Sequence, residues 1–211
     1  MKRLALLLIA AMGVPGLNLA AGVAEAAEDN DKTIAIPATP GNITVEPGNE
    51  VFLIGHAYGT QNYICLPTAT GVAYSLFTPE ATLFNERAKQ LTTHFFSLNP
   101  EEPGVIRPTW QHSRDTSAVW AAMVPGGSST DAAYVQAGAV PWLLLKKMGT
   151  QEGPGGGDTL TQTTFIQRIH TAGGVAPADG CTMATDIGRR AFVPYAADYY
   201  FYRKAGETDR D

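Results

Sequence analysis

Residues 50–77 read EVFLIGHAYGTQNYICLPTATGVAYSLF, and this stretch decides the expected fold class. It contains three short runs rich in apolar and aromatic residues, at 50–58, 61–66 and 71–77, which are separated by Gly and Pro. β-Branched and aromatic residues between such turn residues are typical of strands. The stretch therefore predicts consecutive β-strands joined by short turns.

The same pattern continues along the chain. Further strand candidates, each next to turn residues, lie at residues 42–45, 92–98, 109–112, 117–124, 140–148, 163–170 and 192–203. No window of 11 or more residues keeps a helical period of 3.6 between caps. Residues 130–135 could form one helical turn, and residues 80–91 fit either a helix or a strand and loop. We expect an all-β fold, a single-domain antiparallel β-sandwich or barrel of about nine or ten strands with little helix.

The last strand candidate, FVPYAADYYFYR at residues 192–203, does not alternate between apolar and polar residues. Aromatic side chains occur at both parities, as in strands that are buried on two faces. We therefore expect both faces to be covered, or one of them to face a cleft. Asp198 lies within this run, and a buried carboxylate needs a partner, for which Arg168 and Arg203 are candidates.

The composition excludes several classes of protein. Charged residues make up 17% of the chain, below the roughly 25% of an average soluble domain, so a coiled coil or a charged disordered tail is excluded. The 22 Gly and 14 Pro residues indicate many turns. The net charge of −5 argues against a nucleic-acid partner, because binding to the phosphate backbone needs a basic face.

Residues 1–26 have the three parts of a secretory signal peptide. Two basic residues precede an apolar run at 4–12, which is shorter than the roughly 20 residues of a membrane-spanning helix. An A-x-A pattern predicts cleavage after Ala26, with cleavage after Ala21 as the alternative. We expect a secreted or periplasmic protein with no membrane span after cleavage. The rest of the chain is expected to comprise a disordered segment at residues 27–33, one β domain at 34–204 and a polar tail at 205–211.

Cys65 and Cys181 are the only cysteines of the chain. An even number of cysteines in an oxidising compartment predicts a disulfide between them. A catalytic thiol or a pair of metal ligands is the alternative.

The four histidines lie on separate strand candidates, and none has the close spacing of a metal-binding motif. His94, His112 and His170, with Asp115, could still form a metal site if their strands are neighbours. The alternative is that the histidines are unrelated. No motif indicates a cofactor, since the glycine-rich residues 153–158 lack the Lys and Ser/Thr of a phosphate loop and predict a mobile surface loop.

The most polar strand candidate begins TTFIQRIH at residue 163. Gln167 and Arg168 stand among Ile and Phe residues, which suggests specific hydrogen bonds, either in a buried network that satisfies loop carbonyls or to a ligand. Three Trp and eight Tyr residues fit core packing or stacking on a carbohydrate.

Taken together, these segments resemble the domain of unknown function 3455 (DUF3455) family of bacterial and fungal proteins. The matching segments are GTQNYIC at residues 59–65, HF at 94–95, PTW at 108–110, DTSAV at 115–119, VPWLLL at 140–145, FIQRIHTAGGVAP at 165–177, Cys181 and VPYAADYYFY at 193–202. The resemblance implies export and a single domain but no particular reaction. Two departures are His170, which stands where Asn is expected, and a longer stretch between His94 and Trp110.

The resemblance places His94, Trp110, Gln167 and Arg168 within the family's motifs, and these four are the candidate ligand-binding residues. Two glycines at 173–174 would allow a tight turn after the QRIH strand. A bridge from Cys181 to Cys65 would then bring that turn close to the QNYIC strand.

Two functions remain open at this point. The first is a binding or structural module that engages a small molecule, a glycan or an envelope component through an aromatic-lined cleft. The second is a secreted hydrolytic or metal-assisted enzyme that uses His94 with Asp115 or His170.

Overall fold

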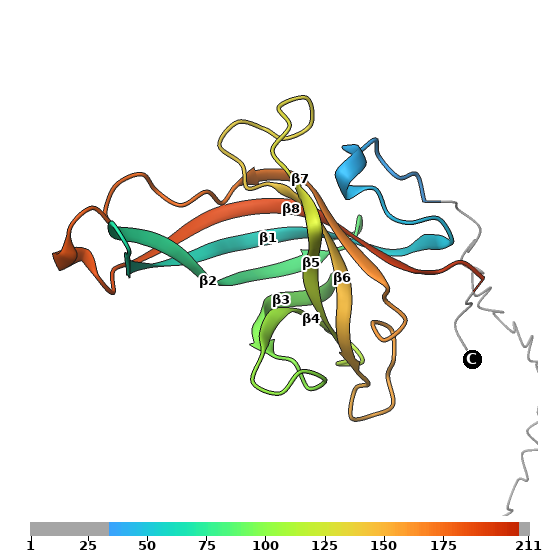
Figure 1. The fold of residues 1–211 in the computed structure, drawn as a ribbon. Coiled ribbons are helices and arrows are strands. Elements are labelled where there is room, and N and C mark those ends of the chain that lie inside the picture. Colours follow the sequence, from blue (N-terminus) through green and yellow to red (C-terminus); the bar gives the residue numbers. More distant parts are fainter. Residues whose placement is uncertain (1–33, 207–211) are drawn as a thin grey trace, which may run out of the picture. The chain divides into compact units, whose positions relative to one another are not determined.

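The structure, a computed structural model, describes residues 34–206. Its strands are β1 (Asn49–Thr68), β2 (Gly71–Phe84), β3 (Gln90–Leu98), β4 (Ile106–His112), β5 (Ala118–Ser129), β6 (Trp142–Gln151), β7 (Phe165–Gly173) and β8 (Arg190–Lys204). They form a closed antiparallel barrel in which each strand pairs with its neighbours in sequence and β8 pairs with β1 (Figure 1). The helical segments in this range are two short turns, η1 (Gly41–Ile43) and η2 (Ala184–Asp186), and neither could cross a membrane. The predicted signal peptide and segment 27–33 lie outside the described residues, as does the tail from residue 207.

The expected all-β antiparallel fold is confirmed, and it is a barrel rather than a sandwich. It has eight strands instead of nine or ten because two expected strands merge into one and residues 42–45 do not form a strand. Residues 50–58 and 61–66 form the single strand β1, since Gly59 lies where β2 approaches most closely. A Cβ at Gly59 would meet the carbonyl oxygen of Glu80 and the backbone of Ala81.

The expected break at Pro79 is also missing, which lengthens β2. Residues 71–77 continue through Pro79 as far as Phe84, because at Pro79 the strand pairs with β1 alone and loses no bond to β3. Residues 80–91 accordingly contain the end of β2, a turn and the start of β3 rather than a helix. Residues 42–45, expected as a strand, instead contain part of η1.

Strands β1, β2 and β8 extend beyond the barrel. β2 pairs with β1 from Gly71 onward, but it pairs with β3 only from Ala81. A three-stranded arm is therefore formed by residues 61–68, 71–80 and 190–194. Figure 1 shows it as the long ribbons that lead away from β3 and β4.

A disulfide between Cys65 and Cys181 joins the arm to the loop between β7 and β8, which confirms the predicted bridge. Both glycines at 173–174 have a positive φ, but Gly173 ends β7 and Gly174 forms a β-bridge with Ala139, so the predicted tight turn does not occur there. The hydroxyl of Tyr63 donates to the carbonyl of Gly174 at 2.6 Å, so the QNYIC strand and the end of β7 are neighbours as expected.

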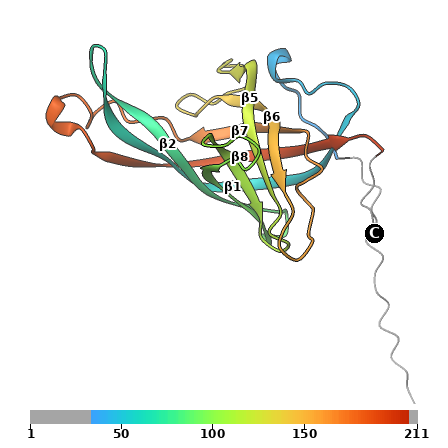
Figure 2. The same cartoon turned by 60° about the horizontal axis from the view of Figure 1, so that its bottom comes forward.

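The barrel has an inner and an outer core. Inside it pack Trp110, Val119, Leu145, Ile166, Tyr199 and Phe201, among others. On the outside, the segment that precedes β1 and the loop before β6 cover strands β5 to β8, and Figure 2 shows the preceding segment in blue on the side of β5 and β6. Tyr199 and Phe201 face the inner core whereas Tyr200 and Tyr202 lie in the outer one, so both faces of the last strand are covered, as predicted.

His170 lies in an irregular part of β7, where the register against β8 shifts between Ile169 and Ala172. Its φ is +49°, in the left-handed region that most residues avoid but that Asn and His adopt more readily. This backbone conformation accounts for His170 at a position where Asn is expected.

We expect His170→Asn to retain nearly all of the free energy of unfolding, whereas His170→Val loses about 2 kcal/mol, because a β-branched side chain is strained at this φ. Urea denaturation of both variants tests this. His170→Ala serves as the control for loss of the imidazole, and equal stability of the Asn and Val variants would contradict the argument.

Candidate functional site

A cavity of about 80 Å³ lies where the barrel meets the arm, and Gln61, Leu76 and Pro79 of the arm form part of its wall. Its volume is well above the roughly 10–15 Å³ that one water molecule needs. The residues that line it come from seven of the eight strands and are Gln61, Leu76, Pro79, His94, Phe96, Pro108, Trp110, Leu143, Leu145, Arg168 and Tyr199. The wall is therefore mostly apolar, with a few polar side chains set into it.

Three of the four candidate ligand-binding residues line this cavity, namely His94, Trp110 and Arg168. Gln167 does not, because adjacent residues of a strand point to opposite faces and Arg168 occupies the inner one. The Gln167 amide donates to the carbonyl of Ile43 at 2.7 Å and accepts from the hydroxyl of Tyr202 at 3.0 Å. Gln167 thus fastens the segment before β1 to the outside of the barrel.

His94 and Trp110 are paired across β3 and β4, and their rings stack at 4.1 Å with an interplanar angle of 8°. The Nδ1 atom of His94 lies 2.9 Å from the carbonyl oxygen of Thr109, which can only accept, so Nδ1 carries the proton and Nε2 is an acceptor. The pKa of His94 is lowered to about 3, mainly because the side chain is buried. The hydrogen bond to Thr109 raises this pKa, and the positive charge of Arg168 lowers it further. His94 is therefore a neutral imidazole at physiological pH.

Arg168 places a guanidinium group at the cavity while its residue is 9% exposed. Its Nη2 donates to the carbonyl of Pro141 at 2.8 Å, and its Nε has no hydrogen-bond partner. Among residues 34–206 no carboxylate forms an ion pair with Arg168. A buried cation is costly unless an anion or several acceptors compensate it.

Asp198, for which Arg168 or Arg203 was the expected partner, is bound on the outer face instead. Its two carboxylate oxygens lie 2.7 Å from Nδ1 of His56 and 2.8 Å from Nδ1 of His170. The prediction was wrong because Asp198 and Arg168 project to opposite sides of the sheet, whereas Arg203 pairs with Glu50.

Two further side chains at the cavity resemble Arg168 in having a buried donor without a partner. These donors are Nε2 of Gln61 and Nε1 of Trp110. The Gln61 amide lies near the hydroxyl of Tyr195, which is itself 3.4 Å from that of Tyr199. The sequence analysis missed Gln61, although it lies within the matching segment GTQNYIC. The other described side chains with unpartnered buried atoms, none of which lines the cavity, are Asn62, Thr92, Trp142 and Thr163.

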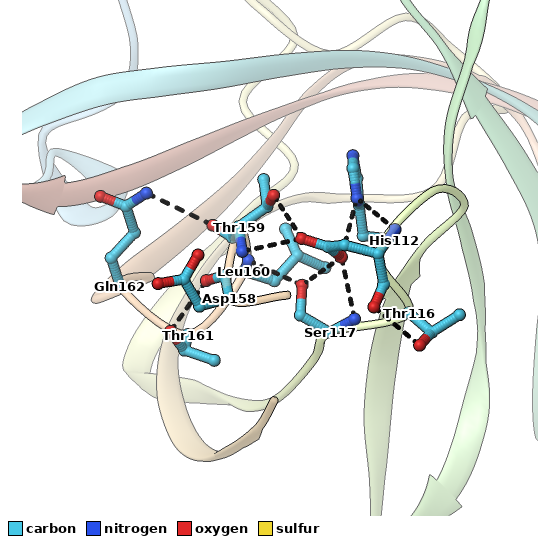
Figure 3. A network of polar contacts seen from close by, with 9 residues as sticks. His112, Thr116, Ser117, Asp158, Thr159, Leu160, Thr161 and Gln162 are labelled. Atoms are coloured by element: carbon cyan, nitrogen blue, oxygen red, sulfur yellow. Dashed lines mark hydrogen bonds and ion pairs between the residues drawn. The ribbon is translucent and has the colours of Figure 1, made fainter. Parts of the chain in front are cut away.

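Asp115, a candidate catalytic or metal-binding residue, lies at the centre of a different network. Its Oδ1 accepts from the backbone and side chain of Ser117 at 2.9 and 2.7 Å, and Nδ1 of His112 lies 2.9 Å away. Its Oδ2 accepts from the backbone and side chain of Thr159. Figure 3 shows Ser117 of the β4–β5 loop and Thr159 of the β6–β7 loop in this network. Because the carboxylate bonds to both residues, it ties the two loops together.

The glycine-rich residues 153–158 pack against this network, although the sequence predicted a mobile surface loop. A Cβ at Gly153 would meet the carbonyl oxygen of Asp115, and one at Gly157 would meet its side chain. These glycines therefore allow the loop to close over the carboxylate.

The three histidines of the metal alternative have separate partners. His94 bonds to Thr109 inside the barrel, His112 to Asp115 and His170 to Asp198. Within residues 34–206 no group of three or more His, Cys, Asp and Glu side chains is arranged to hold a metal ion. In the same part of the chain, no hydrogen bond or ion pair joins His94 to Asp115 or to His170.

Comparison with known proteins gives one match. Residues 46–203 match a family described as protein of unknown function (DUF3455). This range includes every residue that lines the cavity. No curated protein and no solved structure matches the chain.

Proposed function

The chain belongs to the DUF3455 family, and we propose that it is a binding protein that holds a small molecule inside its barrel. One observation carries this proposal, namely the three unpartnered donors of Gln61, Trp110 and Arg168 on the wall of one cavity. Buried donors are nearly always hydrogen-bonded in native proteins, and leaving one unpaired costs about 1–3 kcal/mol. A ligand that carries acceptor atoms satisfies them.

The apolar part of the wall favours an organic ligand. Phe96, Leu143 and Leu145 line the cavity beside the donors, and an apolar pocket with a few convergent polar groups is typical of small-molecule sites. Small antiparallel barrels of eight strands also hold single small ligands in other proteins.

The position of the Trp side chains favours a small molecule over a glycan. All three Trp residues are buried, so among the described residues no Trp offers an open face on which a sugar ring could stack. The disulfide supports the further part of the proposal, that the protein acts after export in a secreted or periplasmic setting.

Native mass spectrometry of the full chain, exported by its own signal and purified without added ligand, tests the proposal. We expect a non-covalent adduct of small mass, which Leu143→Trp removes because the larger side chain fills the cavity. Leu98→Trp is the matched control, since Leu98 is 62% exposed and does not line the cavity. A wild-type chain that carries no adduct, and whose melting temperature no member of a small-molecule panel raises, would contradict the proposal.

A further inference from the structure

We infer that the ligand of the barrel cavity is a small organic monocarboxylate whose carboxylate binds Arg168 and whose apolar part lies against Phe96 and Leu143. This inference rests on the proposed function and adds the chemical class of the ligand. It depends on the charge of the cavity wall, on the kind of polar atoms there and on the volume available.

The first argument is the charge of the wall. Arg168 is a permanent cation, and none of the residues that line the cavity is Asp or Glu. The guanidinium is largely buried, with Nε unpartnered and Nη2 held by the carbonyl of Pro141. An anion at the unpartnered side of the guanidinium would compensate its charge, because charge-assisted hydrogen bonds from Arg to carboxylate are among the strongest in proteins.

The second argument limits the anion to one negative charge. His94 adds no positive charge, because it is a neutral imidazole whose Nδ1 proton is used by Thr109. The wall therefore has a single positive charge, which one carboxylate balances. A phosphate dianion would leave a surplus negative charge against a mostly apolar wall.

The third argument is the match between donors and acceptors. A carboxylate has two oxygen atoms that can each accept more than one hydrogen bond. The unpartnered buried atoms of the cavity are all donors, on Arg168 of β7, Gln61 of β1 and Trp110 of β4. A carboxylate can accept from all three, whereas a neutral alcohol or amide presents fewer acceptor sites.

The volume of the cavity limits the rest of the ligand. At about 80 Å³ it is far smaller than the roughly 300–1,000 Å³ of drug-sized pockets. It therefore suits a carboxylate with a short chain or a single ring. The wall contains Leu76, Phe96, Leu143 and Leu145, and such a chain or ring would bury its apolar surface against them.

The inference is tested by calorimetric titration of the full, oxidised chain with acetate, butyrate, hexanoate and benzoate. Butyramide and benzamide serve as neutral isosteres, and inorganic phosphate as the multivalent anion. We expect one or more carboxylates to bind at least tenfold more tightly than the matching amide. Arg168→Gln should weaken carboxylate binding by about 10- to 100-fold, the range expected for a lost hydrogen bond to a charged group. Arg168→Lys should retain part of the affinity.

Arg114→Gln is the matched control, because it removes one positive charge from an exposed loop residue and should leave the affinity unchanged. The comparison of carboxylate with amide on the wild-type chain needs no variant, so it stands even where Arg168→Gln does not fold. Equal or tighter binding of the amides, or tighter binding of phosphate, would overturn the monocarboxylate while leaving the proposed function intact. A chain that binds none of these compounds and carries no adduct would overturn both.

Discussion

Asp115→Ala is expected to lower the free energy of unfolding by about 3–4 kcal/mol, more than an ordinary surface substitution. The carboxylate accepts two hydrogen bonds from Ser117 and two from Thr159, and it also contacts His112. Alanine leaves the backbone N–H groups of Ser117 and Thr159 without these acceptors. It also separates the β4–β5 loop from the β6–β7 loop, which the carboxylate holds together.

Urea denaturation followed by tryptophan fluorescence measures this loss. Asp131→Ala is the matched control, because Asp131 is an exposed loop residue whose side chain accepts one backbone N–H bond, from Ala133. We expect the control to lose about 1 kcal/mol at most. Similar losses in both variants would show that the Asp115 network does not stabilise the fold as argued here.

The same network gives the stability of the protein a defined dependence on pH. Burial raises the pKa of Asp115, but the hydrogen bonds from Thr159 and Ser117 outweigh burial and hold that pKa well below its ordinary value. The unfolded chain therefore takes up the proton first as the pH falls. The difference in free energy of unfolding between wild type and Asp115→Ala should have its full value at pH 7. It should become smaller below about pH 4, the ordinary pKa of Asp. Burial of neutral His94, whose pKa is lowered to about 3, weakens the wild type and the variant alike below about pH 6.5 and so leaves this difference unchanged.

Removal of the Cys65–Cys181 disulfide is the second change with a large expected effect. The bridge joins residues 116 apart in sequence, and the chain-entropy argument gives about 3–5 kcal/mol for a loop of this length. The double variant Cys65→Ser with Cys181→Ser should lose that much free energy of unfolding. The loss arises mainly in the unfolded state, so the barrel pairing of β1 with β8 should persist.

The reduced and alkylated wild type is the control for this variant, because the chain contains no other cysteine. Both forms should denature at the same urea concentration, below that of the oxidised protein. Thiol titration of the denatured, unreduced protein should find no free thiol. Two free thiols per chain, or equal stability of the oxidised and reduced proteins, would contradict the prediction.

The sequence was sufficient for the features that depend on local pattern. Short runs between Gly and Pro predicted the all-β class, and aromatic residues at both parities of residues 192–203 predicted a strand covered on two faces. The two cysteines predicted the bridge, and with it the proximity of the QNYIC strand to the glycines at 173–174.

The cavity could be predicted only in part, because it depends on pairings between distant strands. His94, Trp110 and Arg168 came from the family's motifs, but their convergence with Gln61 follows from the closure of β1 on β8. Whether Gln167 or Arg168 faces the inside of the barrel could not be decided from residues 163–170, because their pattern does not show which face of the strand is the inner one. The packing of Gly153 and Gly157 on Asp115 could not be predicted either, because the sequence of a loop does not show which residues it packs against.

The pairing of β1 with β8 also determines when the chain acquires its cavity during folding. In this ladder His56 faces Asp198, a residue 142 positions further along the chain, and contacts of such long range form slowly. Each of the other strand pairs joins neighbours in sequence and can form earlier. We therefore expect the donors of Gln61, Trp110 and Arg168 to come together around one space only when the barrel closes.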